Sequence, residues 1–111
     1  MRIALTAGWG LVLLVAPVEA TVLHVPSDVA TIGGALEAAS SSDTILVASG
    51  EYRVNLEWPD APGISLRSES GPSETILDGG GRLQVVGFYT GVDTTTVLSG
   101  FTIRNGHAEG Q

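Results

Sequence analysis

The 111-residue chain has no cysteine and no lysine, and its aromatic residues are few: two tryptophans, two tyrosines and two phenylalanines. Without cysteine it can form neither a disulfide nor a thiolate metal site, and it cannot carry a lipid on an N-terminal cysteine. Its only fixed cations are five arginines. They are outnumbered by twelve acidic residues, which gives a formal net charge of −7. Nucleic acids and anionic membranes require clustered positive charge, so the composition argues against both as partners.

The first twenty residues have the layout of an export signal. Arg2 gives a positive start, Ile3–Ala16 is almost entirely apolar, and the segment ends in a small residue, Ala20. This layout predicts a signal peptide over residues 1–20, cleaved after Ala20, and a secreted, periplasmic or cell-surface protein. The apolar stretch is shorter than the roughly 20 residues that span a bilayer, so we expect no membrane insertion after cleavage. An uncleaved anchor or a buried first strand is the alternative.

The remaining chain, residues 21–111, is one small domain at most, and from Asp43 onward short β-branched runs alternate with glycine-rich polar turns. The expected strands are Thr21–Val25, Thr44–Val47, Tyr52–Trp58, Ile64–Arg67, Glu74–Leu77, Leu83–Tyr89, Thr95–Leu98 and Gly100–Arg104. Runs this short and this evenly punctuated predict a β-solenoid or another many-stranded β fold. The spacings from Ile45 to Ile64 and from Ile76 to Val97 are near one coil of a parallel β-helix. A β-sandwich with antiparallel strands is the alternative.

One helix is expected in the mature chain. Thr31 is a suitable N-cap for Ile32–Ala39, in which Ile32, Ala35, Leu36 and Ala39 form one apolar stripe. Each residue of the Gly33–Gly34 pair weakens the helix by about 1 kcal/mol, so it needs tertiary support. We expect it to cover the N-terminal end of the solenoid, where core and backbone would otherwise be exposed. No similar cap follows, so the C-terminal edge is expected to associate or to continue into more coils.

Five segments follow one another along the chain: Thr31–Ala39, Ser42–Tyr52, Ile64–Pro72, Thr75–Gly81 and Val97–Gly106. In this order they resemble the N-terminal region of right-handed parallel β-helix proteins of the pectin-lyase-like superfamily. The resemblance covers nearly all of residues 21–106. It implies an all-β fold, a right-handed parallel β-helix represented by its first few coils only, with a short N-terminal capping helix.

The resemblance also implies a function. The chain would be the structural N-terminal region of an exported, carbohydrate-active β-helix protein, a polysaccharide lyase or hydrolase whose catalytic coils lie beyond residue 111. A polysaccharide is then the expected partner, and the segment alone is not expected to be an enzyme. We expect no cofactor here, because calcium, which lyases of this superfamily bind through clustered aspartates, would belong to a longer protein. The alternative is a non-catalytic surface or adhesive β-helix that binds glycans or a protein partner.

Several side chains could act on a glycan or bind one. They are Asp60, Asp78, Asp93, His24, His107, Arg67, Arg104, Trp58, Tyr52, Tyr89 and Asn105. Hydrolysis requires two carboxylates that flank the bond, and elimination requires a base. The three aspartates are isolated in sequence and the histidines have no partner at ligand spacing, so no catalytic residue and no metal site is assigned. The arginines are expected chiefly to solubilise strand ends.

The remaining candidates have simple structural interpretations. His24 is expected to face solvent and His107 to lie in a ragged tail. The aromatic rings would stack on sugars if exposed, although Trp58 could instead pack against the following turn. Asn105 is interpreted as a turn residue or as one rung of an asparagine ladder. The run Asp78–Gly81 lacks the Gly-Lys-Ser/Thr of a phosphate loop and is predicted to be a corner between rungs.

Overall fold

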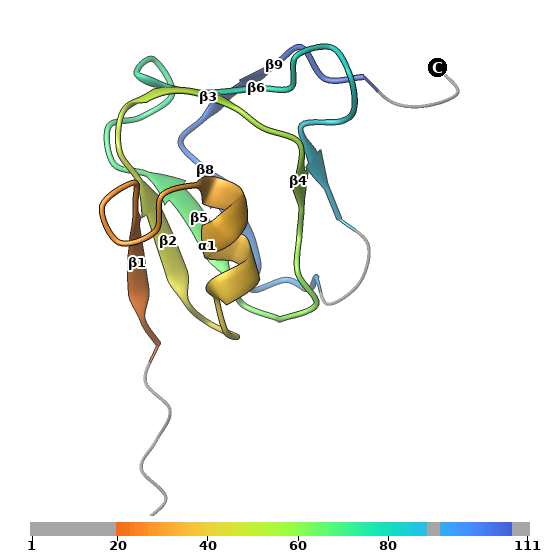
Figure 1. The fold of residues 1–111 in the computed structure, drawn as a ribbon. Coiled ribbons are helices and arrows are strands. Elements are labelled where there is room, and N and C mark those ends of the chain that lie inside the picture. The colour runs from red at the N-terminus through yellow and green to blue at the C-terminus, as the bar shows by residue number, and fades with distance from the viewer. Residues whose placement is uncertain (1–19, 89–91, 108–111) are drawn as a thin grey trace, which may run out of the picture.

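The computed structural model describes residues 20–88 and 92–107, which form a β-solenoid with one short helix (Figure 1). The elements in chain order are β1 (Val22–Val25), α1 (Ile32–Ala38), β2 (Thr44–Val47), β3 (Gly50–Arg53), β4 (Leu56–Glu57), β5 (Ser65–Ser68), β6 (Thr75–Asp78), β7 (Val86–Gly87), β8 (Val97–Ser99) and β9 (Thr102–Arg104). Among these residues no helix is long and apolar enough to cross a membrane.

The strands lie in three sheets, ordered β1-β2-β5-β8, β3-β6-β9 and β4-β7, and every strand pair is parallel. In Figure 1 the chain runs clockwise from β2 through β3 and β4 to β5 while it recedes from the viewer, so the solenoid is right-handed. This is the hand expected of crossovers between parallel strands. The predicted parallel β-helix is confirmed, and the β-sandwich is excluded for the described residues.

The coils have unequal lengths. The central inward-facing row of the first sheet stacks Leu23, Ile45, Leu66 and Leu98. The predicted spacing from Ile45 to Ile64 is close to the coil from Ile45 to Leu66, whereas Ile76 and Val97 lie on β6 and β8, which belong to different sheets. The coil that follows β5 is longer than the coil that follows β2, mainly because the turns between β5 and β6 and between β6 and β7 are longer than those between β2 and β3 and between β3 and β4.

Two predicted strands differ from the structure. The segment Tyr52–Trp58 is not one strand, because the chain turns a corner after Arg53 and divides it between β3 and β4. Leu83–Tyr89 contains only the short strand β7, and Tyr89 lies outside the described residues. A corner in a β-helix keeps the backbone extended on both sides, so a corner without glycine leaves little trace in the sequence.

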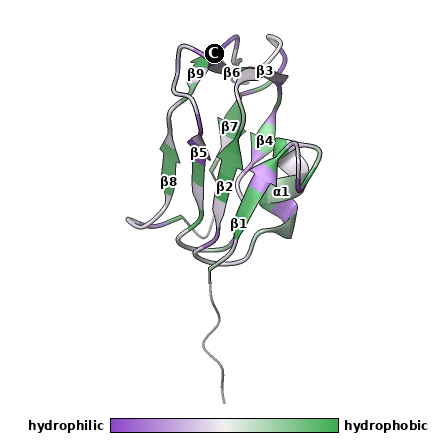
Figure 2. Ribbon diagram, turned by 90° about the vertical axis from the view of Figure 1, so that its left-hand side faces the viewer, coloured by the Kyte–Doolittle hydropathy of each residue, from purple (hydrophilic) through white to green (hydrophobic). Residues whose placement is uncertain are grey.

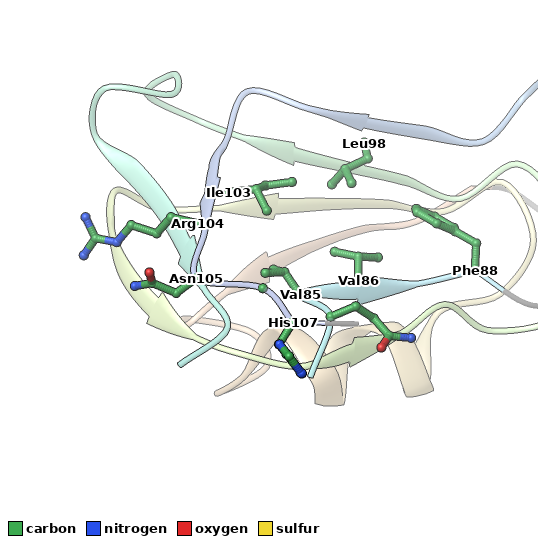
Figure 3. A pocket seen from close by; sticks show the side chains of 10 residues that line it. Val85, Val86, Phe88, Leu98, Ile103, Arg104, Asn105 and His107 are labelled. Carbon is green, nitrogen blue, oxygen red and sulfur yellow. The ribbon is translucent and has the colours of Figure 1, made fainter. Parts of the chain in front are cut away.

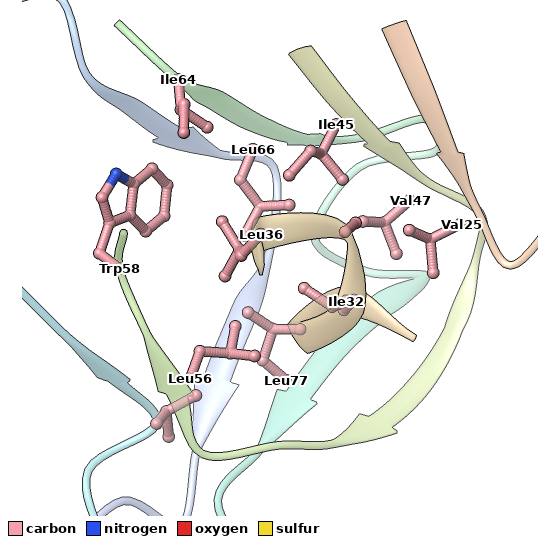
Figure 4. Close-up of a cluster of buried hydrophobic side chains, with 12 residues drawn as sticks. Val25, Ile32, Leu36, Ile45, Val47, Leu56, Trp58, Ile64, Leu66 and Leu77 are labelled. Carbon is pink, nitrogen blue, oxygen red and sulfur yellow. The ribbon is translucent and has the colours of Figure 1, made fainter. Parts of the chain in front are cut away.

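Helix α1 covers the N-terminal end of the solenoid, as predicted. The Thr31 hydroxyl accepts a hydrogen bond from the backbone N–H of Gly34 at 3.0 Å, and Ala39 is the C-cap. The helix contacts β1, β2 and β4, and its buried residues Ile32, Ala35 and Leu36 fill the end of the core. Figure 4 shows Ile32 and Leu36 pointing among the strand side chains.

The core runs through the coils as a continuous apolar column (Figure 4). Its buried members are Val25, Ile32, Ala35, Leu36, Ile45, Val47, Leu56, Trp58, Ile64, Leu66, Leu77 and Val85. Figure 2 shows the first sheet from its outer side, with α1 beside β1 at one end and β8 at the other. The two ends therefore differ, since one is covered by a helix and, in the part of the chain that the structure describes, no helix covers the other.

Candidate functional site

The end of the solenoid opposite α1 is open. Strand β8 is the last strand of the first sheet, β9 of the second and β7 of the third. Each of these strands pairs with a neighbour on one side only among the described residues, so its outer backbone groups can accept another strand. The three free edges lie at the same end of the solenoid, which is the geometry that a further coil would require.

A cavity of about 500 Å³ opens at this end (Figure 3). Its apolar walls are Val85, Val86, Phe88, Leu98 and Ile103, and polar side chains including Arg104, Asn105 and His107 line the rest. The side chains of Ile103 and Phe88 are 49% and 46% exposed, although both are large and apolar. None of the described lining residues is acidic. The site can therefore bind an apolar surface, but it does not hold the carboxylate pair that glycoside hydrolysis requires.

An ionic ladder lies on the outer side of the second sheet, close to this opening. Arg104 on β9 donates from Nε to Asp78 on β6 at 3.1 Å and from a terminal nitrogen to Glu51 on β3 at 2.5 Å. The Asp78 carboxylate also accepts the Gly80 N–H at 2.8 Å and the Asn105 amide at 3.1 Å. Glu51 and Asp78 are thus both bonded to one guanidinium, which ties three successive strands together. This contact could not be predicted from one sequence, since it depends on strand register.

The pKa of Asp78 is held below its usual value, chiefly by the Gly80 N–H and then by Asn105 and Arg104. A carboxyl whose pKa is lowered by folding stabilises the fold above its ordinary pKa of about 3.9, and this contribution disappears as the pH falls through the lowered value. We therefore expect the midpoint temperature of unfolding to decrease as the pH is lowered below about 4. In Asp78→Asn the midpoint should already be lower at pH 7 and should fall less on acidification.

Thermal unfolding followed by circular dichroism between pH 7 and pH 2 measures this difference. Asp28 and Asp93 also have lowered pKa values, because of bonds from His24 and Thr95 respectively. Asp28→Asn is the matched control, because it also removes a carboxylate with a lowered pKa. The Asp28 side chain is half exposed, whereas the Asp78 side chain is 8% exposed. Equal acid dependence of the wild type and Asp78→Asn would contradict the assigned role.

The three candidate aspartates are not brought together. Asp78 lies in the ladder, Asp60 is exposed in the turn between β4 and β5, and Asp93 lies in the loop before β8, where it accepts the Thr95 N–H at 2.9 Å. Within residues 20–88 and 92–107, no group of three or more histidines and acids could hold a metal ion. Arg67 is exposed on β5. These positions leave no catalytic residue assigned.

The two histidines lie in different surroundings. The His24 side chain is 44% exposed, as expected of a solvent-facing residue, and its Nδ1 lies 3.0 Å from a carboxylate oxygen of Asp28. His107 donates its backbone N–H to the Leu83 carbonyl at 3.0 Å and lines the cavity. The predicted ragged tail is wrong at this residue, because this bond joins it to the preceding coil.

The described aromatic candidates are not sugar platforms. Trp58 is 3% exposed and its ring centroid lies 5.0 Å from that of Phe88, so its side chain belongs to the core. Tyr52 is half-buried and donates its hydroxyl to the Ala48 carbonyl at 2.8 Å. Burial, and secondarily the charge of Glu69, raises the pKa of Tyr52. The prediction for Tyr89 falls outside the described residues.

Asparagines stabilise the corners in a way that the sequence did not reveal. The Asn55 amide lies 3.2, 3.3 and 3.1 Å from the carbonyls of Gly79, Leu83 and Gln84. Asn105 has a φ of 58°, which suits its predicted role in a turn. Its side chain bonds to Asp78, and its interpretation as one rung of an asparagine ladder whose other rungs are missing stays a prediction. The polar residue Asn55, within the predicted strand Tyr52–Trp58, was the one signal in the sequence for the corner between β3 and β4.

Comparison with known proteins adds no identification, since no protein-family model, no curated protein and no solved structure matches the chain.

Proposed function

We propose that this chain is the structural N-terminal region of an exported β-helix protein of the pectin-lyase-like type, with carbohydrate-active coils stacked on its open end. The difference between the two ends supports this proposal. At one end α1 buries Ile32 and Leu36 completely, whereas at the other Phe88 and Ile103 remain about half exposed. A region that caps one end and offers three strand edges at the other is suited to start a longer solenoid.

The proposal places polysaccharide chemistry in the added coils. In the described residues the neighbouring carboxylates Glu51 and Asp78 are both bonded to Arg104, so neither is free to transfer a proton. The cavity at the open end has Arg104, Asn105 and His107 among its polar lining residues, but none of its described lining residues is a carboxylate that could act as acid or base. Uronic-acid polymers are the proposed substrate class, and the role of the present coils is to nucleate the fold and to hold the following ones in register.

The native exported product tests the carbohydrate-active part of the proposal. Its intact mass, measured after purification from the source, is expected to exceed that of residues 21–111, and its extra coils are expected to cleave uronic-acid polymers. Release of reducing or unsaturated ends is the measurement, with heat-denatured product as the control. A native product that ends at Gln111 and stays monomeric would contradict the proposal.

A charge placed on the open end tests the role of this surface. The change Ile103→Glu is expected to abolish self-association and to remove most binding of a hydrophobic dye, because an ionised carboxylate resists burial. Stability should change by no more than about 0.5 kcal/mol, since the side chain is exposed. Analytical ultracentrifugation and dye fluorescence measure both effects. Val22→Glu is the matched control, since Val22 is 46% exposed but lies on β1 at the capped end. Equal effects of the two changes would contradict the assignment.

A further inference from the structure

Asp43 has a buried carboxylate immediately before β2. The residue is 7% exposed, and its two carboxylate oxygens accept hydrogen bonds from the backbone nitrogens of Thr21 and Ser40, both at 2.8 Å. The parallel register pairs Val22 with Thr44, so the residues that precede β1 and β2 lie side by side. The carboxylate therefore joins the start of the first strand to the loop that follows α1.

This carboxylate has no cationic partner among residues 20–88 and 92–107. The ion pairs of this part of the chain join His24 to Asp28 and Arg104 to Glu51 and Asp78. Carboxylates are seldom buried to this degree without a countercharge, because removing the charge from water is costly. The two backbone N–H groups compensate only part of that cost. A positive group beside Asp43 would complete the site.

Removal of the predicted signal peptide would supply that group. The Ala20–Thr21 bond lies between two exposed residues, which makes it accessible to a peptidase. Its hydrolysis by water gives a carboxylate on Ala20 and an α-ammonium group on Thr21, whose ordinary pKa is about 8. The nitrogen that now donates to Asp43 as a neutral amide would then carry a positive charge at the same position.

We propose that cleavage after Ala20 creates an ion pair between the α-ammonium group of Thr21 and the carboxylate of Asp43, which fastens the new N-terminus to the first coil. The proposal rests on the export included in the proposed function. A charge-assisted hydrogen bond is stronger than a neutral one, so the processed chain holds β1 and the loop after α1 more firmly than the precursor does.

The lysine-free sequence makes a direct test available. After cleavage, residues 21–111 contain one primary amine, the N-terminus, so in a protein made of these residues an amine-acylating reagent reports on Thr21 alone. A precursor of residues 1–111 is exported and processed in a bacterial host, and the N-terminus is established by intact mass. Native wild type should be acylated at least about five times more slowly than Asp43→Asn, the factor that corresponds to about 1 kcal/mol. In denaturant the two rates should be equal.

A second variant keeps Asp43 in place. Insertion of one alanine between Ala20 and Thr21 leaves Thr21 as a neutral amide after processing and moves the amine away. The insertion should raise the unfolding equilibrium constant of the wild type about fivefold and leave that of Asp43→Asn unchanged. This double-mutant cycle measures the coupling even if one variant is much less stable.

The outcomes separate the two proposals. Processing to Thr21 with slow acylation and positive coupling supports the ion pair. Processing to Thr21 with equal acylation rates and no coupling overturns the ion pair and leaves export intact. A precursor that is not cleaved, or is cleaved at another bond, overturns the ion pair together with the predicted signal peptide.

Discussion

Replacement of Leu66 with alanine is expected to lower the free energy of unfolding by about 2–5 kcal/mol. Leu66 is fully buried and stacks between Ile45 on β2 and Leu98 on β8. The cavity left by the missing methyl groups cannot easily close, because the flanking strands are fixed by backbone hydrogen bonds. A domain of this size has a stability of only about 5–10 kcal/mol, so a large share of it would be lost.

Urea denaturation followed by circular dichroism measures this loss, with an unchanged slope showing that the same surface is exposed on unfolding. Val22→Ala is the matched control, since it also shortens an apolar strand residue of the first sheet but at an exposed position. Its effect should remain within about 0.5 kcal/mol. A loss below about 1 kcal/mol for Leu66→Ala would contradict the stacked core.

The sequence predicted the features of the fold that depend on local patterns. Thr31 and the spacing of Ile32, Ala35 and Leu36 marked the helix and its buried face, because capping and helical periodicity act within a few residues. Short β-branched runs marked most of the strands in the same way. The open end followed from the absence of a second capping segment in the pattern.

Features that depend on register could not be read from one sequence. The contacts of Arg104 with Glu51 and Asp78 join residues on three strands, and strands pair according to the lengths of turns that the sequence specifies only loosely. For the same reason the spacing of Ile45 and Ile64 indicated the approximate length of a coil but not that Ile45 stacks on Leu66. For Trp58 the expected contacts were a sugar or the following turn, whereas the buried ring lies against Phe88 of the next coil, which one sequence could not reveal.

Replacement of Gly79 with alanine is expected to destabilise the protein at a corner of the solenoid. A Cβ at this position would lie 2.7 Å from the Asn105 carbonyl oxygen and 2.9 Å from a methyl carbon of Val85. The oxygen belongs to the backbone of the next coil and is held there by the Gly81 N–H at 2.7 Å, so it cannot move away independently. Strain of this kind costs about 1–3 kcal/mol, and more where backbone must shift.

Gly33→Ala is the matched control, because the same methyl group would meet only Leu56, at 4.0 Å, and would remove a helix-weakening glycine from α1. This change should stabilise the protein by up to about 1 kcal/mol, so the two variants should shift the urea midpoint in opposite directions.

Gly79→Ala has a second consequence, since Asn105 and Val85 line the cavity at the open end. If the corner sets the shape of that surface, Gly79→Ala should also alter hydrophobic dye binding under native conditions, whereas Gly33→Ala should not. A stable Gly79→Ala protein with normal dye binding would show that the corner can move without the next coil, which contradicts the close stacking on which the proposed role depends.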